Sequence, residues 1–183
     1  MEVQKKSMEE LNRKDVSEFK SMNKFPLVVI LDQVRSGLNV GSVFRTADAF
    51  ALEAVVCVGF TPAPPHREIL KTALGSCDSV TWQHFDNITE AIGYWKDKNY
   101  QIWALEQTTG SVPLEDMPLN DRPTVLILGN EVTGVSDEAL QLCDGCWEIT
   151  QYGTKHSLNV AVSAGMAIYQ WVQRFNHGQK ASS

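Results

Sequence analysis

The sequence predicts an α/β fold with a mostly parallel sheet flanked by helices, and three observations support this prediction. Short apolar runs rich in β-branched residues recur along the chain, which is typical of strands buried on both faces. Segments with the 3.6-residue period of a helix lie between these runs. The alternation of strands and helices indicates a parallel sheet. The length of 183 residues, 43% of them hydrophobic, suits one such domain.

The expected strands are short apolar runs, and the strongest follows Pro26 and reads Leu-Val-Val-Ile-Leu. Strands are expected at 27–31, 54–58, 100–105 and 124–128, with a weaker run at 79–82 and a short strand that leads up to Ile149. Helices are expected at 40–50, 88–98, 136–142 and 158–175. In the first of these helices, one side carries Val40, Val43, Phe44, Ala47 and Phe50.

The chain divides into three expected regions. Residues 1–23 are polar and charged and are expected to form a helical arm, residues 24–175 the main domain, and residues 176–183 a flexible tail. No apolar run reaches the roughly 18 residues that span a bilayer, so no membrane partner is expected. The first residues lack the apolar stretch and cleavage site of a secretory signal. We therefore expect a cytoplasmic protein.

The cysteines and the charge restrict the possible partners. Cys143 and Cys146 have the C-x-x-C spacing of some zinc and redox sites. A zinc site needs four ligands, and the sequence has no second such pair and no paired histidines, so we expect free thiols and no metal. The net charge of −6 disfavours a nucleic-acid partner. Residues 1–45, however, hold eight basic and six acidic residues, so phosphate contacts are expected there.

Several common motifs are missing from the sequence. No G-x-G-x-x-G follows the first expected strand, which argues against the usual dinucleotide fingerprint. No G-x-x-x-x-G-K-[ST] is present, so a nucleotide triphosphatase is not expected. The G-x-S-x-G elbow of α/β-hydrolases is absent as well.

The first block with chemical character runs from Asn39 to Phe50. Asn39 is a good N-cap for the expected helix. Arg45 lies nearly opposite the apolar side of that helix, so the core does not use it. By itself this pattern also fits a capped surface helix with a solvated arginine.

The second block, Leu128-Gly-Asn-Glu-Val-Thr-Gly134, comes directly after an expected buried strand. Loops at the carboxyl ends of strands are where α/β sheets bind ligands. Gly129 and Gly134 would let a ligand approach the backbone closely, and Asn130 and Glu131 add polar groups. The same residues also suit a tight turn between a strand and a helix.

The third block, residues 149–163, runs from a strand end through a glycine loop to the start of a helix. Ser157 can cap this helix, and Asn159 lies two residues further on. Residues 161–167 are mostly small, which permits close packing of another backbone.

In this order, the three blocks resemble the SpoU/TrmH family of RNA 2′-O-methyltransferases within the SPOUT class. They match the patterns N-x-G-x-x-x-R-x-A, G-N-E-x-x-G and S-L-N-V of that family. The matching residues are Asn39, Gly41, Arg45 and Ala47; Gly129, Asn130, Glu131 and Gly134; and Ser157, Leu158, Asn159 and Val160. The resemblance covers roughly residues 24–175, and Thr72–Gly75 and Ala104–Glu106 are similar as well.

The resemblance implies a C-terminal trefoil knot, S-adenosyl-L-methionine as cofactor, and a homodimer that pairs the first and last helices of the domain. The implied cofactor-binding residues are Leu105, Glu106, Leu128, Gly129, Asn130, Gly134, Ile149, Gln151, Gly153, Ser157 and Leu158. The implied catalytic residues are Arg45, Asn39, Glu131, Ser157 and Asn159.

The implied reaction is displacement of the sulfonium methyl group by a ribose 2′-hydroxyl of RNA, with tRNA expected before rRNA. Arginine stays protonated in proteins, so we expect Arg45 to hold the adjacent phosphate and lower the pKa of the hydroxyl. Asn39 would orient Arg45 or the ribose, and Glu131 would offset the positive charge. Ser157 and Asn159 would fix the loop of the knot.

Two features depart from the family pattern, and one rival function stays open. Thr150 stands where the family usually has proline, which is expected to loosen the cofactor loop. The chain has no room for the added RNA-binding domain of many members, so RNA selection is expected to rest on the catalytic domain, the arm and a second subunit. The rival is a non-catalytic RNA- or cofactor-binding module on the same scaffold, which the acidic net charge favours. Methylation of a base or a protein is less attractive, because the arginine block belongs to the ribose-methylating branch.

Overall fold

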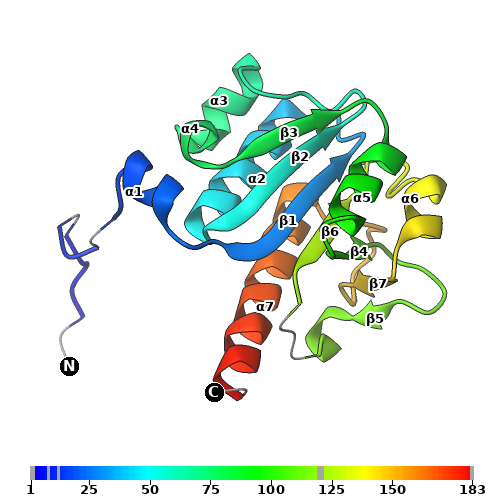
Figure 1. The fold of residues 1–183 in the computed structure, drawn as a ribbon. Coiled ribbons are helices and arrows are strands. Elements are labelled where there is room, and N and C mark those ends of the chain that lie inside the picture. The colour runs from blue at the N-terminus through cyan, green and yellow to red at the C-terminus, as the bar shows by residue number, and fades with distance from the viewer. Residues whose placement is uncertain (1–2, 8, 12, 119–121, 182–183) are drawn as a thin grey trace.

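The computed structural model describes residues 3–7, 9–11, 13–118 and 122–181, and it places a parallel sheet between two layers of helices (Figure 1). Within these ranges the sheet has seven strands in the order β3-β2-β1-β6-β4-β7-β5, and every pairing is parallel. The strands are β1 (Phe25–Asp32), β2 (Leu52–Val58), β3 (Trp82–Phe85), β4 (Gln101–Leu105), β5 (Val112–Pro113), β6 (Thr124–Leu128) and β7 (Gly145–Glu148). The predicted α/β class is confirmed.

The helices divide between the two faces of the sheet. One face is covered by α1 (Val16–Ser21), α2 (Gly37–Ala49), α3 (Arg67–Ala73), α4 (Ser76–Ser79), the short 3₁₀ helix η1 (Leu114–Asp116) and α7 (Val160–Ala181). The other face is covered by α5 (Ile88–Lys96) and α6 (Asp137–Leu142). The carboxyl ends of all the strands therefore lie at one edge of the sheet, between the two helical layers.

Burial on both faces explains the continuous apolar runs. In β1, Leu27, Val29 and Leu31 face the layer of α2 and α7, whereas Val28 and Ile30 face α5 and α6, and all five are fully buried. Burying one such side chain contributes about 1.5–3 kcal/mol relative to leaving it in water. The central strands are thus held from both sides, which fixes the loops at their ends.

One strand prediction and both helix-cap predictions were wrong. The weak strand expected at 79–82 is displaced, because Ser79 ends α4 and the strand β3 begins at Trp82. Asn39 is not the N-cap of α2; that helix begins at Gly37 and is capped by Ser36, whose hydroxyl accepts from the Asn39 amide at 3.3 Å. Ser157 likewise does not cap α7, which begins at Val160.

The two ends of the chain differ in their structure. In the expected arm, α1 is closed by a capping box in which Asp15 and Glu18 bond each other's backbone amides, while residues 1, 2, 8 and 12 lie outside the described residues. The expected flexible tail instead continues α7 as far as Ala181, and residues 182 and 183 lie outside the described residues. In the described part of the chain, no helix is long and apolar enough to cross a membrane.

The four cysteines are free thiols. Burial, with a smaller contribution from the neighbouring Cys146, raises the pKa of Cys143 to about 12. A thiol with such a pKa is almost wholly protonated at neutral pH, and the thiolate is the form that attacks or binds metals. No three His, Cys, Asp or Glu side chains gather into a metal site anywhere in the described ranges.

Candidate functional site

A cleft of about 490 Å³ lies at the carboxyl ends of β4, β6 and β7. Its walls come from residues 105–108, 128–135 and a third segment between 148 and 158. Its volume falls within the range of sites that bind small molecules, and the edge on which it lies is the usual ligand edge of a parallel sheet. Every residue predicted to bind the cofactor lines this cleft except Gly153, which lies in the exposed part of the third segment.

The loop after β6 is folded by the side chain of Asn130. The backbone amide and carbonyl of Asn130 bond those of Gly134, both at 2.9 Å. The side-chain oxygen of Asn130 accepts from the amides of Val132 and Thr133 at 2.8 and 3.2 Å. Its side-chain nitrogen donates to the carbonyl of Gln33, at 2.7 Å. Asn130 therefore both closes this loop and ties it to the end of β1.

The two glycines of this loop are required by close packing within the protein. Gly134 has a φ of +73°, and a Cβ placed there would strike the carboxylate of Glu106. A Cβ on Gly129 would strike the backbone of Gly134 and Val135. The Glu106 carboxylate in turn accepts from the Val135 amide at 3.0 Å. The glycines thus bring the loops after β4 and β6 together and shape the wall of the cleft.

Glu131 holds the segment that leads into α2. One carboxylate oxygen accepts from the amide of Arg35 at 2.9 Å, and the other accepts from the amide of Ser36 at 3.1 Å and from the side chain of Asn39 at 2.9 Å. Burial alone would raise the pKa of Glu131, but the hydrogen bonds from Arg35, Asn39 and Ser36 outweigh it and hold the pKa below its ordinary value. Glu131 is therefore a carboxylate at neutral pH.

Asn159 joins the third block to the first. Its side-chain nitrogen donates to the side-chain oxygen of Asn39 at 3.1 Å. Its own side-chain oxygen accepts from the amides of Ala161 and Val162 at 2.9 and 3.3 Å, so Asn159 caps α7. Glu131, Asn39 and Asn159 form one connected hydrogen-bonded unit, named here the three-block network, although they lie far apart in the sequence.

The two remaining candidate catalytic residues lie in different positions relative to the cleft. Ser157 lines the cleft. Arg45 does not line it, and lies six residues beyond Asn39, which is about 9 Å further along α2. Arg45 is exposed, and its guanidinium has no hydrogen bond or ion pair with any residue that the structure describes. Within one chain, the arginine therefore stays apart from the cleft.

Sequence reasoning missed two residues that shape the site. Gln33 adopts a φ of 56° directly after β1 and offers the carbonyl that Asn130 needs. Ser36 caps α2 and donates to Glu131. The available signal was the polar run that follows the first apolar strand, since such runs mark the carboxyl edge of a sheet.

The chain is similar to known proteins over most of its length. The model of the SpoU rRNA Methylase family matches residues 26–169. The tRNA (guanosine(18)-2′-O)-methyltransferase of Escherichia coli strain K12 is 32% identical over 144 residues, which cover 79% of this chain and 62% of that protein. The 23S rRNA (guanosine-2′-O-)-methyltransferase RlmB of Neisseria meningitidis serogroup B is 31% identical over 144 residues, covering 78% and 56%. The chain thus spans less than two thirds of the length of these relatives.

Solved structures show the same fold. A TrmH/SpoU tRNA modifying enzyme of A. aeolicus superimposes with a TM-score of 0.79 at 26% identity, over 91% of this chain and 84% of that one. An AdoMet-bound rRNA methyltransferase from Sinorhizobium meliloti superimposes with a TM-score of 0.75 at 27% identity, over 86% and 60% of the two chains.

Proposed function

The chain belongs to the SpoU rRNA Methylase family, and on that premise we propose that it methylates a ribose 2′-hydroxyl of RNA with S-adenosylmethionine as the methyl donor. The observation that carries the proposal is the three-block network, because it assembles residues from all three motifs and includes Glu131 of the cleft wall. Relatives named as tRNA and rRNA 2′-O-methyltransferases support an RNA substrate. We expect tRNA first and rRNA second.

The cleft suits the proposed cofactor. Leu105, Ile149 and Leu158 offer apolar surface for an adenine ring, and polar backbone groups of the same loops surround them. When bound, S-adenosylmethionine supplies a methyl group that its sulfonium already activates. The protein must then position a ribose 2′-hydroxyl against that methyl group and lower the pKa of the hydroxyl.

We propose that two copies of the chain pair through the outer face of α7 and the start of α2. Val162, Met166 and Tyr169 form a stripe along one side of α7 and are 54%, 44% and 54% exposed. Leu38 on α2, which packs against α7, is 43% exposed. Apolar residues gathered in this way mark an interaction surface. This face also carries α2, the helix on which Arg45 lies.

A dimer would explain how an arginine remote from its own cleft takes part in the reaction. In this proposal, Arg45 of the partner subunit reaches the cleft, binds the phosphate next to the target ribose, and lowers the pKa of the 2′-hydroxyl. Arginine keeps its charge at neutral pH, so it acts through electrostatics and positioning and does not remove the proton itself. The proton of the 2′-hydroxyl would leave late in the reaction and pass to water. Glu131 already accepts three hydrogen bonds, so its role is to position Asn39 and α2.

The trefoil knot belongs to the same proposal. The segment after β7 leaves the sheet, passes Gln107, whose side chain donates to the carbonyl of His156 at 3.5 Å, and reaches α2 at Asn39. We propose that this crossing threads the chain through the earlier loop. The expected location in the cytoplasm stays a prediction.

A mixing experiment tests both the activity and the pairing. Arg45→Ala and Gly134→Val are each expected to lose methyl transfer from labelled S-adenosylmethionine to total tRNA. If Arg45 acts across the dimer, a re-annealed equal mixture recovers about a quarter of wild-type activity, since half of the dimers are mixed and each has one complete site. No recovery would refute action across the dimer. Cofactor binding by the wild type without transfer to any RNA would support the non-catalytic rival.

A further inference from the structure

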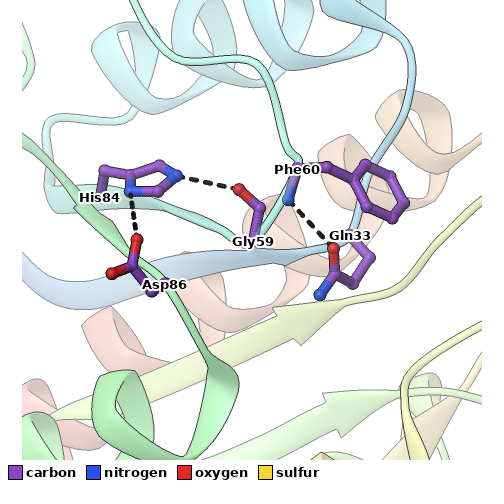
Figure 2. A network of polar contacts seen from close by, with 5 residues as sticks. All are labelled: Gln33, Gly59, Phe60, His84 and Asp86. Atoms are coloured by element: carbon purple, nitrogen blue, oxygen red, sulfur yellow. Dashed lines mark hydrogen bonds and ion pairs between the residues drawn. The ribbon is translucent and has the colours of Figure 1, made fainter.

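An exposed aromatic ring stands on the loop that follows β2. Phe60 is 60% exposed, although it lies two residues beyond a strand that is almost completely buried. Figure 2 shows the ring extending from the loop on the side opposite His84 and Asp86. A single exposed apolar side chain needs no explanation by itself, so the case depends on how this one is held and where it lies.

The backbone beneath Phe60 is fixed from two directions (Figure 2). The amide of Gly59 donates to the carbonyl of Phe85, and the ring nitrogen Nε2 of His84 donates to the carbonyl of Gly59, both at 3.0 Å. On the other side, the amide of Phe60 donates to the side-chain oxygen of Gln33 at 3.1 Å. Gly59 has a φ of +62° and presses against the amide group of Gln33, where a Cβ would collide. The loop cannot easily retract the ring.

The next residue adds a further anchor. Thr61 is only 3% exposed, and its hydroxyl donates to the carbonyl of Leu31 at 3.0 Å and accepts from the amide of Val34 at 2.9 Å. Phe60 is therefore an exposed ring between two fixed neighbours. Such a ring binds a partner at little cost in conformational entropy, because its backbone is already ordered.

Gln33 also connects this ring to the cleft. Its side chain holds Phe60, and its backbone carbonyl accepts from the side chain of Asn130, which folds the cleft loop. The strands β2, β1 and β6 are consecutive in the sheet, so the loops after β2 and β6 lie about 10 Å apart, two strand spacings. Phe60 therefore lies at the same edge of the sheet as the cleft, two strands away from the cleft loop that follows β6.

An exposed arginine lies in the loop after β1, the strand between β2 and β6. Arg35 follows β1 by three residues and is exposed, and its guanidinium has no partner among the residues that the structure describes. Its backbone amide is bonded to Glu131 of the cleft loop. Exposed aromatic rings interspersed with arginine are how proteins bind unpaired nucleotides, through base stacking and phosphate contacts.

We propose that Phe60 stacks on a base of the RNA substrate beside the target ribose, and that Gln33 positions the ring. This inference rests on the proposed function, and deepens it by assigning a substrate-binding residue outside the three motifs. A phenyl ring has no hydrogen-bonding group, so it accepts any base; it selects for an unstacked, single-stranded nucleotide. The proposed substrate is accordingly an RNA loop whose bases are accessible.

The test measures methyl transfer to total tRNA from cells that lack this gene. Phe60→Ala is expected to raise KM for tRNA roughly tenfold to a hundredfold, the usual effect of losing one stacked base. Phe60→Tyr and Phe60→Trp should restore KM, and Phe60→Leu should not. Trp82→Ala is the matched control, since Trp82 is a partly exposed aromatic at the opposite, amino end of the neighbouring strand. Calorimetry should give the same cofactor Kd for every variant.

Gln33 needs its own readout because it acts through Phe60. Gln33→Ala is expected to raise KM for tRNA with little change in kcat, and Gln33→Glu, which keeps an oxygen for the Phe60 amide, should restore it. Equal KM values for the wild type and Phe60→Ala would overturn the proposal. Full rescue by Phe60→Leu would also overturn it, because leucine can replace an apolar contact with protein but cannot stack on a base. A change in the oligomeric state of Phe60→Ala on sedimentation would overturn it too, because it would place Phe60 in a contact between proteins.

Failure of the proposed function gives a different result. In that case the wild type itself transfers no methyl group, and filter retention of the same tRNA then tests Phe60 directly. Weaker retention by Phe60→Ala than by the wild type would support stacking without catalysis. Equal retention would overturn the stacking proposal.

Discussion

Replacing Glu131 by glutamine should destabilise the protein by an amount that depends on pH. In Glu131→Gln, the amide oxygen can keep the bonds from Ser36 and Asn39, but an NH₂ group then faces the amide of Arg35. One hydrogen bond to a charged acceptor is lost, which would cost about 1.5–3 kcal/mol in full burial. Glu131 is exposed, so solvent screening reduces the expected loss to about 1 kcal/mol. For a chain of this length, that lowers Tm by about 2–4 °C.

The pH dependence of this difference follows from the pKa of Glu131, which is lower in the folded protein than its ordinary value of 4.5. A carboxyl group of this kind stabilises the fold at pH values above its unfolded pKa, and the stabilisation is lost as pH falls through the folded pKa. The Tm gap between the wild type and Glu131→Gln should therefore be constant near pH 7 and should close below pH 4.5. Thermal melting followed by circular dichroism across this range measures it.

A matched control separates this local effect from the loss of one negative charge. Glu9→Gln makes the same charge change in an exposed residue of the N-terminal segment, and it should leave Tm unchanged at every pH. If Glu131→Gln melts with the wild type at pH 7, the carboxylate does not hold the start of α2. If the gap persists unchanged into acid, the proton linkage is wrong.

The other predictions concern the motifs and the pairing of subunits. Arg45→Ala should abolish methyl transfer while calorimetry shows an unchanged cofactor Kd; wild-type turnover would remove Arg45 from the mechanism. Gly134→Ala places a side chain at a residue with a positive φ, in space that Glu106 already fills. It should therefore lower the free energy of unfolding by about 1–3 kcal/mol, measured by denaturant unfolding, and weaken cofactor binding, measured by calorimetry. Asn159→Ala removes the cap of α7 and should cost about 1 kcal/mol in denaturant unfolding, whereas Asn159→Asp, which keeps the acceptor, should lose less. Met166→Asp should convert dimers into monomers on analytical sedimentation, and unchanged dimers would exclude this face.

The central part of the fold could be predicted because its strands are buried on both sides. Residues 27–31 of β1 and 125–128 of β6 are all apolar for that reason, and the helix period of α2 reflects a single buried side. The strand predicted at 79–82 was misplaced for two reasons. The actual strand, β3, is an edge strand whose residues are at most partly buried, and the helix before it, α4, consists mostly of polar residues. The strand β5 has only two residues, too few to form a pattern. The strand order depends on contacts between distant segments, which periodicity does not contain.

The site was predictable in its parts and not in its connections. Gly129 could be placed in a cleft because loops at the carboxyl ends of parallel strands meet there, whereas Ser157 was placed there by the resemblance to the family. That Glu131 would accept from the backbone of Arg35 and Ser36 could not be foreseen, since backbone amides have no signature in a sequence. The helix caps failed for a related reason. Several polar residues precede each helix, and tertiary contacts decide which of them is the cap.

The helices α2 and α7 carry both the proposed interface and the edge of the cleft. The contribution of the partner subunit and the contribution of the cleft can nevertheless be tested separately. Both α2 and α7 begin at the three-block network, where Glu131 lies against the positive end of α2, and both present their outer faces to the proposed partner. Splitting the dimer at Met166 would remove Arg45 of the partner subunit while leaving the cleft of each chain intact. Turnover should then fall with cofactor affinity unchanged. Loosening the network at Glu131 should instead weaken cofactor binding in both monomer and dimer, because the carboxylate belongs to the cleft loop itself.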